Sequence, residues 1–278
     1  SAFLSMARII VPTDFSAGAL NAAVHAVRLF GAEGNTFILL HAYKLPASDP
    51  AATFNLDELL AREALRGSHA FEGSVRERFP GEKLHLETIC EHGDLPNVID
   101  RFADDAERPM CVVMGTQGAS GVKEVLFGSN TAAVIKQCSL PVLAVPTDAG
   151  FRAPRRIVLA DDGGPVQKPS LSLLLDLARW YHGEVRVTRV VNESVAAASE
   201  QEPAYDTILG AIPHTQQFLS ADDVEAALND FAEQGDADLL VVLHRERGIF
   251  HGLFQRSMSA KLAMHTHLPL LVLRQAEH

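Results

Sequence analysis

The chain has 278 residues, of which 47% are hydrophobic and 21% charged, and this composition is typical of a folded protein with room for two domains. Its 24 lysines and arginines against 35 aspartates and glutamates give a formal net charge of −11, so no global basic surface is available for a nucleic acid. No apolar run approaches the roughly 18 residues that a membrane helix needs, and no signal peptide is evident. The 3 cysteines form no C-x-x-C pair and are expected to be reduced thiols in a cytoplasmic protein.

The first part of the chain predicts strands that alternate with helices. Short apolar runs indicate the strands, apolar residues at helical spacing indicate the helices, and Ser16 is placed to cap the first helix. In chain order, we expect a strand at 8–13, a helix from Ser16 to Phe30, a strand at 36–43, a loop at 45–55, a helix at about 56–78, a strand at 83–90 and a helix at 94–106.

A glycine-rich stretch follows, between a buried strand at 111–114 and a helix at 131–137, and a last strand is expected at Val142–Val145. Glycines between a strand end and a helix start suit an anion site, because the backbone can come close to the ligand and the helix offers unpaired N–H groups. Ser129 is placed to cap this helix and to offer a hydroxyl to a phosphate. The alternative from spacing alone is a connection with flexible glycines.

The second half repeats the first. Arg156 to Asp162 matches Arg8 to Asp14, and a strand at 270–273 answers Val142–Val145. Between them we expect a helix at 170–181, a strand at 184–192, a helix at 222–231 and a strand at 239–243. Residues 196–220 predict either a helix plus a short strand near 215–219 or a long loop, and residues 151–155 are the expected join. Such a duplication indicates two similar domains, which we place at 6–147 and 154–278.

The spacing Gly115-x2-Gly118-x9-Gly128, followed by Ser129 and Asn130, resembles the nucleotide loop of the universal stress protein family in its ATP-binding branch. The resemblance covers nearly the whole chain as a tandem of two such domains. It implies an α/β fold with two doubly wound parallel five-stranded sheets, Rossmann-like and of order 3-2-1-4-5, with nucleotide bound where the strand order reverses.

The resemblance also implies the residues that contact ATP in the first domain. Asp14 ends the first strand and would meet the ribose or hold the Mg²⁺ or Mn²⁺ that accompanies ATP, and the alternative is that it caps the next helix. The candidate nucleotide-binding residues are Pro12, Thr13, Asp14, Ala42, Met114, Gly115, Gly118, Gly128, Ser129, Asn130 and Thr131.

Neither a G-K-[ST] loop nor G-x-G-x-x-G occurs, and Lys123 is the only cation between Gly115 and Asn130. The stretch offers no evident general base or arginine finger for fast phosphoryl transfer. We therefore expect an ATP-binding regulatory module of the stress response, with a slow ATPase or adenylate-forming enzyme as the alternative and a nucleotide-free interaction scaffold as the third reading. The histidines at 244, 251, 265 and 267 are interpreted as solvated or capping residues in preference to metal ligands, and His41 as structural.

Two expectations concern how the halves differ and pair. Residues 244–249 and Arg256 stand where the first loop has its glycines, so the second half is expected not to bind ATP, with Arg256 pairing Asp162. The alternative is a different anion site formed by Arg245, Arg247, His251 and Arg256. The family resemblance implies that the two halves form a pseudo-dimer through their last strands, and a homodimer of whole chains is compatible with the sequence.

Overall fold

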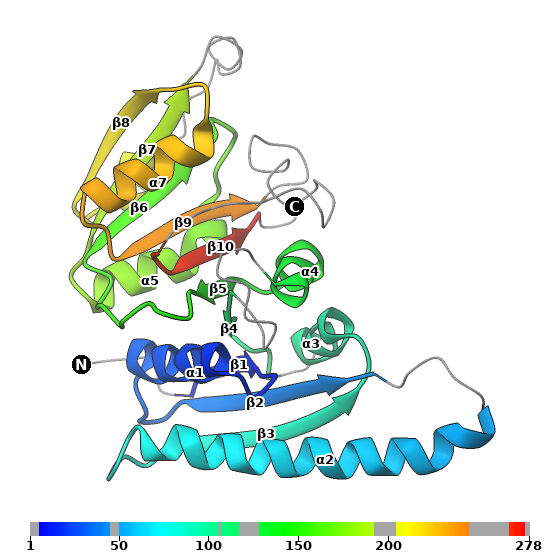
Figure 1. Ribbon diagram of the computed structural model, residues 1–278. Coiled ribbons are helices and arrows are strands. Elements are labelled where there is room, and N and C mark those ends of the chain that lie inside the picture. The colour runs from blue at the N-terminus through cyan, green and yellow to red at the C-terminus, as the bar shows by residue number, and fades with distance from the viewer. Residues whose placement is uncertain are drawn as a thin grey trace. The chain divides into compact units, whose positions relative to one another are not determined.

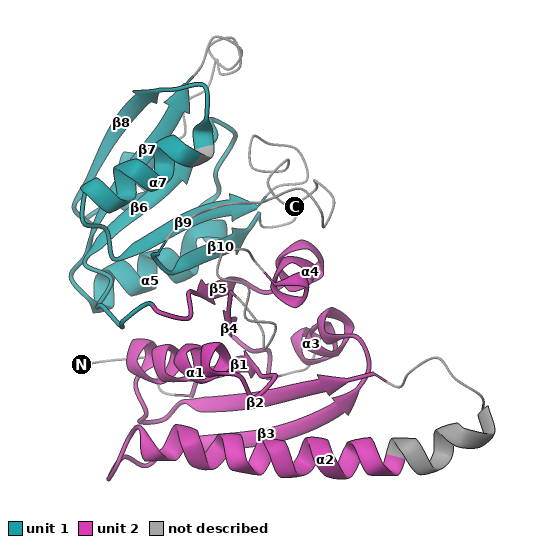
Figure 2. Cartoon of the chain, in the orientation of Figure 1, with its two compact units in different colours: residues 1, 122–127, 149–278 teal, residues 2–121, 128–148 magenta. Residues whose placement is uncertain are grey.

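The computed structural model describes residues 6–44, 50–104, 107–116, 128–191, 204–244 and 267–275, with the backbone alone for residues 50–57 and 225 (Figure 1). The described residues up to 148 form one compact unit, and those from 149 onward form a second (Figure 2). No helix in these parts of the chain combines the length and the hydropathy that a membrane crossing requires.

The first unit is a parallel five-stranded sheet in the order β3-β2-β1-β4-β5. Its strands are β1 (Arg8–Pro12), β2 (Thr36–Tyr43), β3 (His85–His92), β4 (Cys111–Gly115) and β5 (Val142–Val145). Its helices are α1 (Ala17–Phe30), α2 (Pro50–Glu77), α3 (Leu95–Ala103) and α4 (Ser129–Gln137).

The order of the strands fixes which helices share a face of this sheet. The chain moves one way from β1 to β3 and the other way from β3 to β5, and right-handed crossovers then place α1 and α2 on one face and α3 and α4 on the other. In agreement, α1 contacts α2 and α3 contacts α4. Because both faces are covered, Ile9, Ile10 and Val11 are all fully buried in succession, whereas every residue of the outer strand β3 is exposed or half-buried.

Local signals placed most helix ends correctly. Ser16 caps α1, its hydroxyl accepting a hydrogen bond from the N–H of Ala19 at 3.2 Å, and Gly31 ends the helix with φ 80. The predicted loop at 45–55 is wrong in its second part, because α2 begins at Pro50. Proline is compatible with the first turn of a helix, where its missing N–H would have had no intrahelical partner.

The second unit has the same order, β8-β7-β6-β9-β10, and all of its strands are parallel. Its strands are β6 (Arg156–Asp161), β7 (Glu184–Val191), β8 (His214–Ser220), β9 (Leu239–His244) and β10 (Leu270–Arg274). Its described helices are the 3-10 turn η1 (Lys168–Leu171), α5 (Ser172–Trp180), α6 (Tyr205–Leu209) and α7 (Val224–Gln234). The predicted fold class is confirmed, and so is the helix-plus-strand interpretation of residues 204–220.

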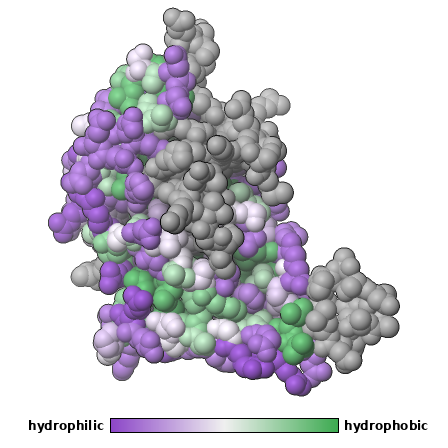
Figure 3. All heavy atoms as spheres, in the orientation of Figure 1, coloured by the Kyte–Doolittle hydropathy of each residue, from purple (hydrophilic) through white to green (hydrophobic). Residues whose placement is uncertain are grey.

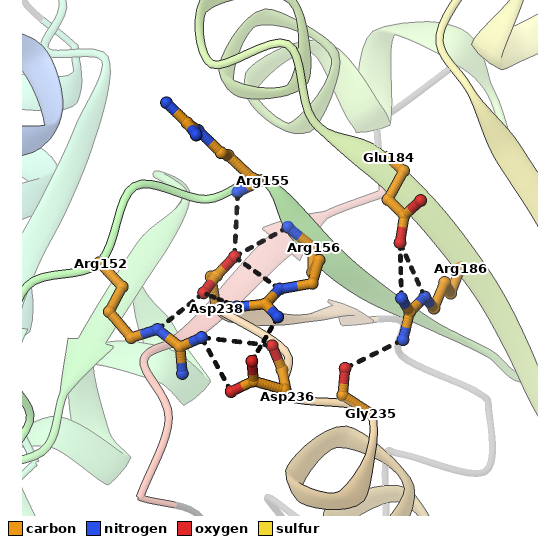
Figure 4. A network of polar contacts seen from close by, with 8 residues as sticks. All are labelled: Arg152, Arg155, Arg156, Glu184, Arg186, Gly235, Asp236 and Asp238. Atoms are coloured by element: carbon orange, nitrogen blue, oxygen red, sulfur yellow. Dashed lines mark hydrogen bonds and ion pairs between the residues drawn. The ribbon is translucent and has the colours of Figure 1, made fainter.

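A polar network at the start of β6 holds the chain where it enters the second unit (Figure 4). The buried carboxylate of Asp238 accepts hydrogen bonds from the backbone N–H groups of Arg155, at 3.2 Å, and Arg156, at 2.9 Å. The guanidinium of Arg152 contacts both Asp236, at 2.9 Å, and Asp238, at 2.8 Å. The first strand of the unit is thereby tied to the segment that precedes β9.

On the face drawn in Figure 3, hydrophilic side chains cover much of the second unit.

Candidate functional site

A cavity of about 420 Å³ lies at the carboxyl ends of β1, β2 and β4 in the first unit. Strands β1 and β4 are neighbours in the sheet, and the strand order reverses between them. Open α/β sheets place ligands at this point, because the two flanking connections leave the sheet in opposite directions. The lining residues are Pro12, Thr13, Asp14, Ala19, His41, Ala42, Lys44, Gly93, Asp94, Leu95, Met114, Gly115, Gly128, Ser129, Asn130 and Thr131.

The segment after β1 is held by its own side chains. The Thr13 hydroxyl accepts a hydrogen bond from the N–H of Phe15 at 2.9 Å, and the Asp14 carboxylate accepts one from the N–H of Ser16 at 3.1 Å. His41 lies 2.8 Å from the carbonyl of Thr13 through Nδ1, which must carry the proton because a carbonyl only accepts. The backbone of Thr13 is therefore fixed, whereas the Asp14 side chain is exposed to the cavity mouth.

An aromatic stack supports this segment from behind. Phe15 has φ 66, a left-handed conformation that is rare for a bulky residue, and its ring stacks on His41 with centroids 4.4 Å apart. The ring of Phe71, in α2, is tilted relative to the Phe15 ring, and the two ring centroids are 6.2 Å apart. A Cβ on Gly67 of α2 would lie only 2.5 Å from the Phe15 ring, so glycine at this position makes room for the stack.

Gly115 at the end of β4 is required by packing inside the unit. A Cβ there would lie 3.0 Å from the carbonyl carbon and oxygen of Gly18, in the first turn of α1. The two glycines, Gly18 and Gly115, allow α1 to approach β4 closely. Gly115 therefore has a packing role that is separate from any contact with a ligand. Thr131 also has a structural role, because its buried hydroxyl donates a hydrogen bond to the carbonyl of Gly115 at 2.8 Å.

The amino end of α4 faces the cavity without a side-chain cap. The prediction that Ser129 caps this helix is wrong: Gly128 is the N-cap residue, and Ser129 is the first helical residue. Glycine has no side chain to bond the first N–H groups, and the Gly128 N–H itself donates to the carbonyl of Thr116 at 2.5 Å. Ser129 and Asn130 are exposed. The helix end therefore offers N–H donors and the positive end of its dipole to an anion.

All but one of the predicted nucleotide-binding residues line this single cavity, and the exception, Gly118, lies outside the described residues. Sequence reasoning missed six lining residues: Ala19, His41, Lys44, Gly93, Asp94 and Leu95. Lys44 and Gly93 directly follow β2 and β3, so the rule that places ligands at carboxyl ends of strands would have found them. Asp94 precedes α3 as expected, but its carboxylate makes no capping bond and pairs with Lys44.

The universal stress protein family matches the chain twice, over residues 6–146 and over residues 154–274. The chain belongs to this family. It is therefore a tandem universal stress protein, with one match in each half of the sequence.

Relatives agree with this assignment. A universal stress protein of Methanocaldococcus jannaschii is 31% identical over 142 residues, which cover 50% of this chain and 81% of that protein. A second from the same organism is 30% identical over 154 residues and is covered to 93%. The crystal structure of a universal stress protein from Archaeoglobus fulgidus matches 97% of both chains with a TM-score of 0.65 at 18% identity, a likeness of fold.

The second universal stress protein domain differs at the position that answers Thr13. Asp161 stands there, with its side chain only 3% exposed, and Arg189 of β7 donates to it from Nε at 2.8 Å. The guanidinium also lies 5.6 Å from the Phe218 ring centroid and within 3.3 Å of a Cβ built on Gly163. Burial, and then the charge of Asp161, raise the pKa of the neighbouring Tyr205 hydroxyl. This buried ion pair fills space beside the carboxyl end of β6.

The predicted partner of Asp162 was Arg256, which lies outside the described residues, as do Arg245, Arg247 and His251. Asp162 itself accepts a hydrogen bond from the N–H of Gly164 at 3.1 Å. In the described parts of the chain, no group of three or more histidine, cysteine or acidic residues is arranged to hold a metal ion.

Proposed function

We propose that the first domain binds ATP together with Mg²⁺ or Mn²⁺ and acts as a nucleotide-dependent regulatory module of the stress response. The observation that carries this proposal is the cavity at the β1–β4 switch point, into which the uncapped amino end of α4 opens. A phosphate there would receive N–H donors that no side chain of the helix uses. The cavity volume of about 420 Å³ lies within the range of small-molecule sites.

The lining residues form three groups, which would contact the phosphates, the ribose or metal, and the base. Gly128, Ser129 and Asn130 would face the phosphates, with N–H groups and exposed polar side chains. Asp14 offers a carboxylate to a ribose hydroxyl or to the metal that accompanies the phosphates. The base would lie against the backbones of Pro12, Thr13, Ala42 and Met114. The hydrogen bond from His41 to the Thr13 carbonyl holds the second of these in place.

A binding role is favoured over rapid catalysis by the charges at the cavity. Among the lining residues that the structure describes, Lys44 is the one lysine or arginine, and it is paired with Asp94. Phosphoryl transfer requires cations that neutralise charge developing on the transferred group. In the proposed regulatory role, a bound nucleotide would instead change the interactions of the domain with its partners.

The experiment is to denature the purified protein, identify released nucleotide, and titrate ATP with Mg²⁺ by calorimetry. Gly128→Val should abolish binding, because its side chain would stand where phosphate oxygens approach. Gly150→Val is the matched control: a Cβ at Gly150 meets nothing within 4 Å, so binding should be unchanged. Undiminished binding by Gly128→Val would place the site elsewhere.

The same samples separate the alternatives. Release of phosphate or AMP over hours would indicate the slow ATPase or adenylate-forming enzyme, and a lack of any nucleotide binding would leave the interaction scaffold. We further propose that the second domain does not bind ATP in this manner, because the Asp161–Arg189 pair occupies the position that answers Thr13 and His41. A stoichiometry of one ATP per chain is expected, and two would contradict it.

We also propose that the two domains pair as a pseudo-dimer through β5 and β10, the last strand of each domain's own sheet. Both strands are short and apolar, and an apolar strand at the end of a sheet needs cover. Hydrogen exchange should show slow amide exchange in both strands, and rapid exchange in both would count against the pairing.

A further inference from the structure

A second cavity, of about 530 Å³, lies within the second domain and is unrelated to the nucleotide site. It is a groove between α5 and the connection from α6 to β8. Its lining residues include Lys168, Arg179, His182, Ile208, Leu209 and Ile212. In the first domain, the connection between the corresponding strands carries α2, a helix of 28 residues, whereas the described part of this one carries α6, of 5 residues.

The groove has an apolar floor and a basic rim. Ile208, Leu209 and Ile212 are at most 9% exposed and form the floor, whereas Lys168 and His182 at the rim are exposed. None of the described lining residues is acidic. This local excess of positive charge contrasts with the net charge of −11 of the whole chain.

The rim cations are available to a ligand. In the described part of the chain, the Arg179 guanidinium makes one ion pair, to Asp176 at 3.3 Å, which uses one of its five N–H groups. Within the described residues, no ion pair involves Lys168 or His182, and both side chains line the groove and are exposed. Three cationic or protonatable groups above an apolar floor define an amphipathic site.

The backbone of His182 gives a second, independent reason to regard the rim as functional. His182 has φ 50, in the left-handed region, at the end of α5. The following residue, Gly183, closes the helix by donating to the carbonyl of Ala178 at 2.8 Å. Glycine adopts this conformation with less strain, and in the first domain Gly31 occupies the end of α1 with φ 80. A histidine here places an imidazole on the groove rim at some cost to stability.

We propose that this groove binds a small amphipathic anion, with its apolar chain on Ile208, Leu209 and Ile212 and its carboxylate or phosphate between Lys168, Arg179 and His182. The chemistry of the groove matches such a ligand in both parts: burial of the chain supplies affinity, and the cations select an anionic headgroup over a neutral one. The inference does not depend on ATP binding in the first domain.

Calorimetric titration of the full chain with octanoate, octyl phosphate and octanol tests the proposal. The anion with the fitting headgroup should bind once per chain, roughly tenfold or more tighter than octanol, and the tighter of the two anions identifies the headgroup. The double variant Lys168→Gln/Arg179→Gln should weaken it roughly tenfold. Its matched control is Arg78→Gln/Lys83→Gln, an equal change of charge on exposed residues of the first domain, which should leave affinity unchanged.

His182→Gly separates a ligand role from a structural one. This variant relieves the left-handed strain, so it should raise the thermal midpoint of the second domain while it weakens anion binding severalfold. Equal affinity for octanol and both anions, or undiminished anion binding by the double variant, would overturn the proposal. Because the replaced side chains are exposed, an unchanged melting curve of the double variant excludes misfolding as the cause of lost binding.

Discussion

Gly67→Ala and Gly73→Ala replace two glycines of the same helix, α2, and should change stability in opposite directions. A helix interior favours alanine over glycine by about 1 kcal/mol. A Cβ on Gly73 would meet nothing within 4 Å, so Gly73→Ala should stabilise the first domain by about 0.5–1 kcal/mol. A Cβ on Gly67 would lie 2.5 Å from Cε2 and 2.9 Å from Cδ2 of Phe15, a separation that real contacts do not tolerate.

The Phe15 ring has little freedom to move away. It is stacked on His41 at 4.4 Å, it lies near Phe71 at 6.2 Å, and its own backbone is held at φ 66. Forced repacking of this kind costs about 1–3 kcal/mol, which exceeds the gain in helix propensity. Gly67→Ala should therefore lower the free energy of unfolding by about 1 kcal/mol, and the two variants should differ by about 2 kcal/mol.

Urea unfolding of both variants measures this difference, since the change in the unfolded chain is the same for the two glycines and cancels. With a denaturant slope of about 2 kcal/mol per molar, the two midpoints should differ by about 1 M. Equal stabilisation by both substitutions would refute the reasoning. Adding Phe15→Leu should recover most of the loss in Gly67→Ala, because it removes the ring that the new methyl group meets.

Three further outcomes are expected for the second domain. Asp238→Asn should destabilise it by about 2–3 kcal/mol in chemical unfolding, because the buried oxygens would no longer carry the charge that the surrounding arginine and N–H donors pair with. The hydrogen bond of His214 to a backbone carbonyl, and then its contact with Asp206, raise the pKa of His214 above 6.5. The stability that protonated His214 contributes is therefore fully present below pH 6.5 and is lost as pH rises through the folded pKa. Asp206→Asn should lower the melting temperature below pH 6.5 and change it little at high pH. Arg189→Ala should cost about 3–5 kcal/mol because it leaves the Asp161 carboxylate buried without a cation beside it. A smaller loss in Arg189→Ala/Asp161→Ala, measured by unfolding, would distinguish this from simple loss of packing.

The sequence by itself determined the alternation of strands and helices, the duplication, and the set of glycines and polar residues between β4 and α4. These follow from local chemistry: runs such as Ile9 to Val11 read as strands because both faces are buried, and Ser16 and Gly31 mark the ends of α1 through capping and backbone conformation. The family resemblance then gathered residues from β1, β2 and β4 into one expected site, and the structure places all of them that it describes around one cavity.

Tertiary structure alone decided what each of these residues does. Gly115 is needed where α1 packs closely on β4, and the Thr131 hydroxyl donates to the carbonyl of Gly115. Lys44, which follows β2, pairs with Asp94, which precedes α3. The same holds for the second domain, where Asp161 is paired by Arg189, 28 residues away in sequence, a partner that sequence reasoning did not predict. Spacing along the chain reports which residues share a strand or a turn, but partners brought together by neighbouring parallel strands depend on register, and register is fixed only when the whole sheet has packed.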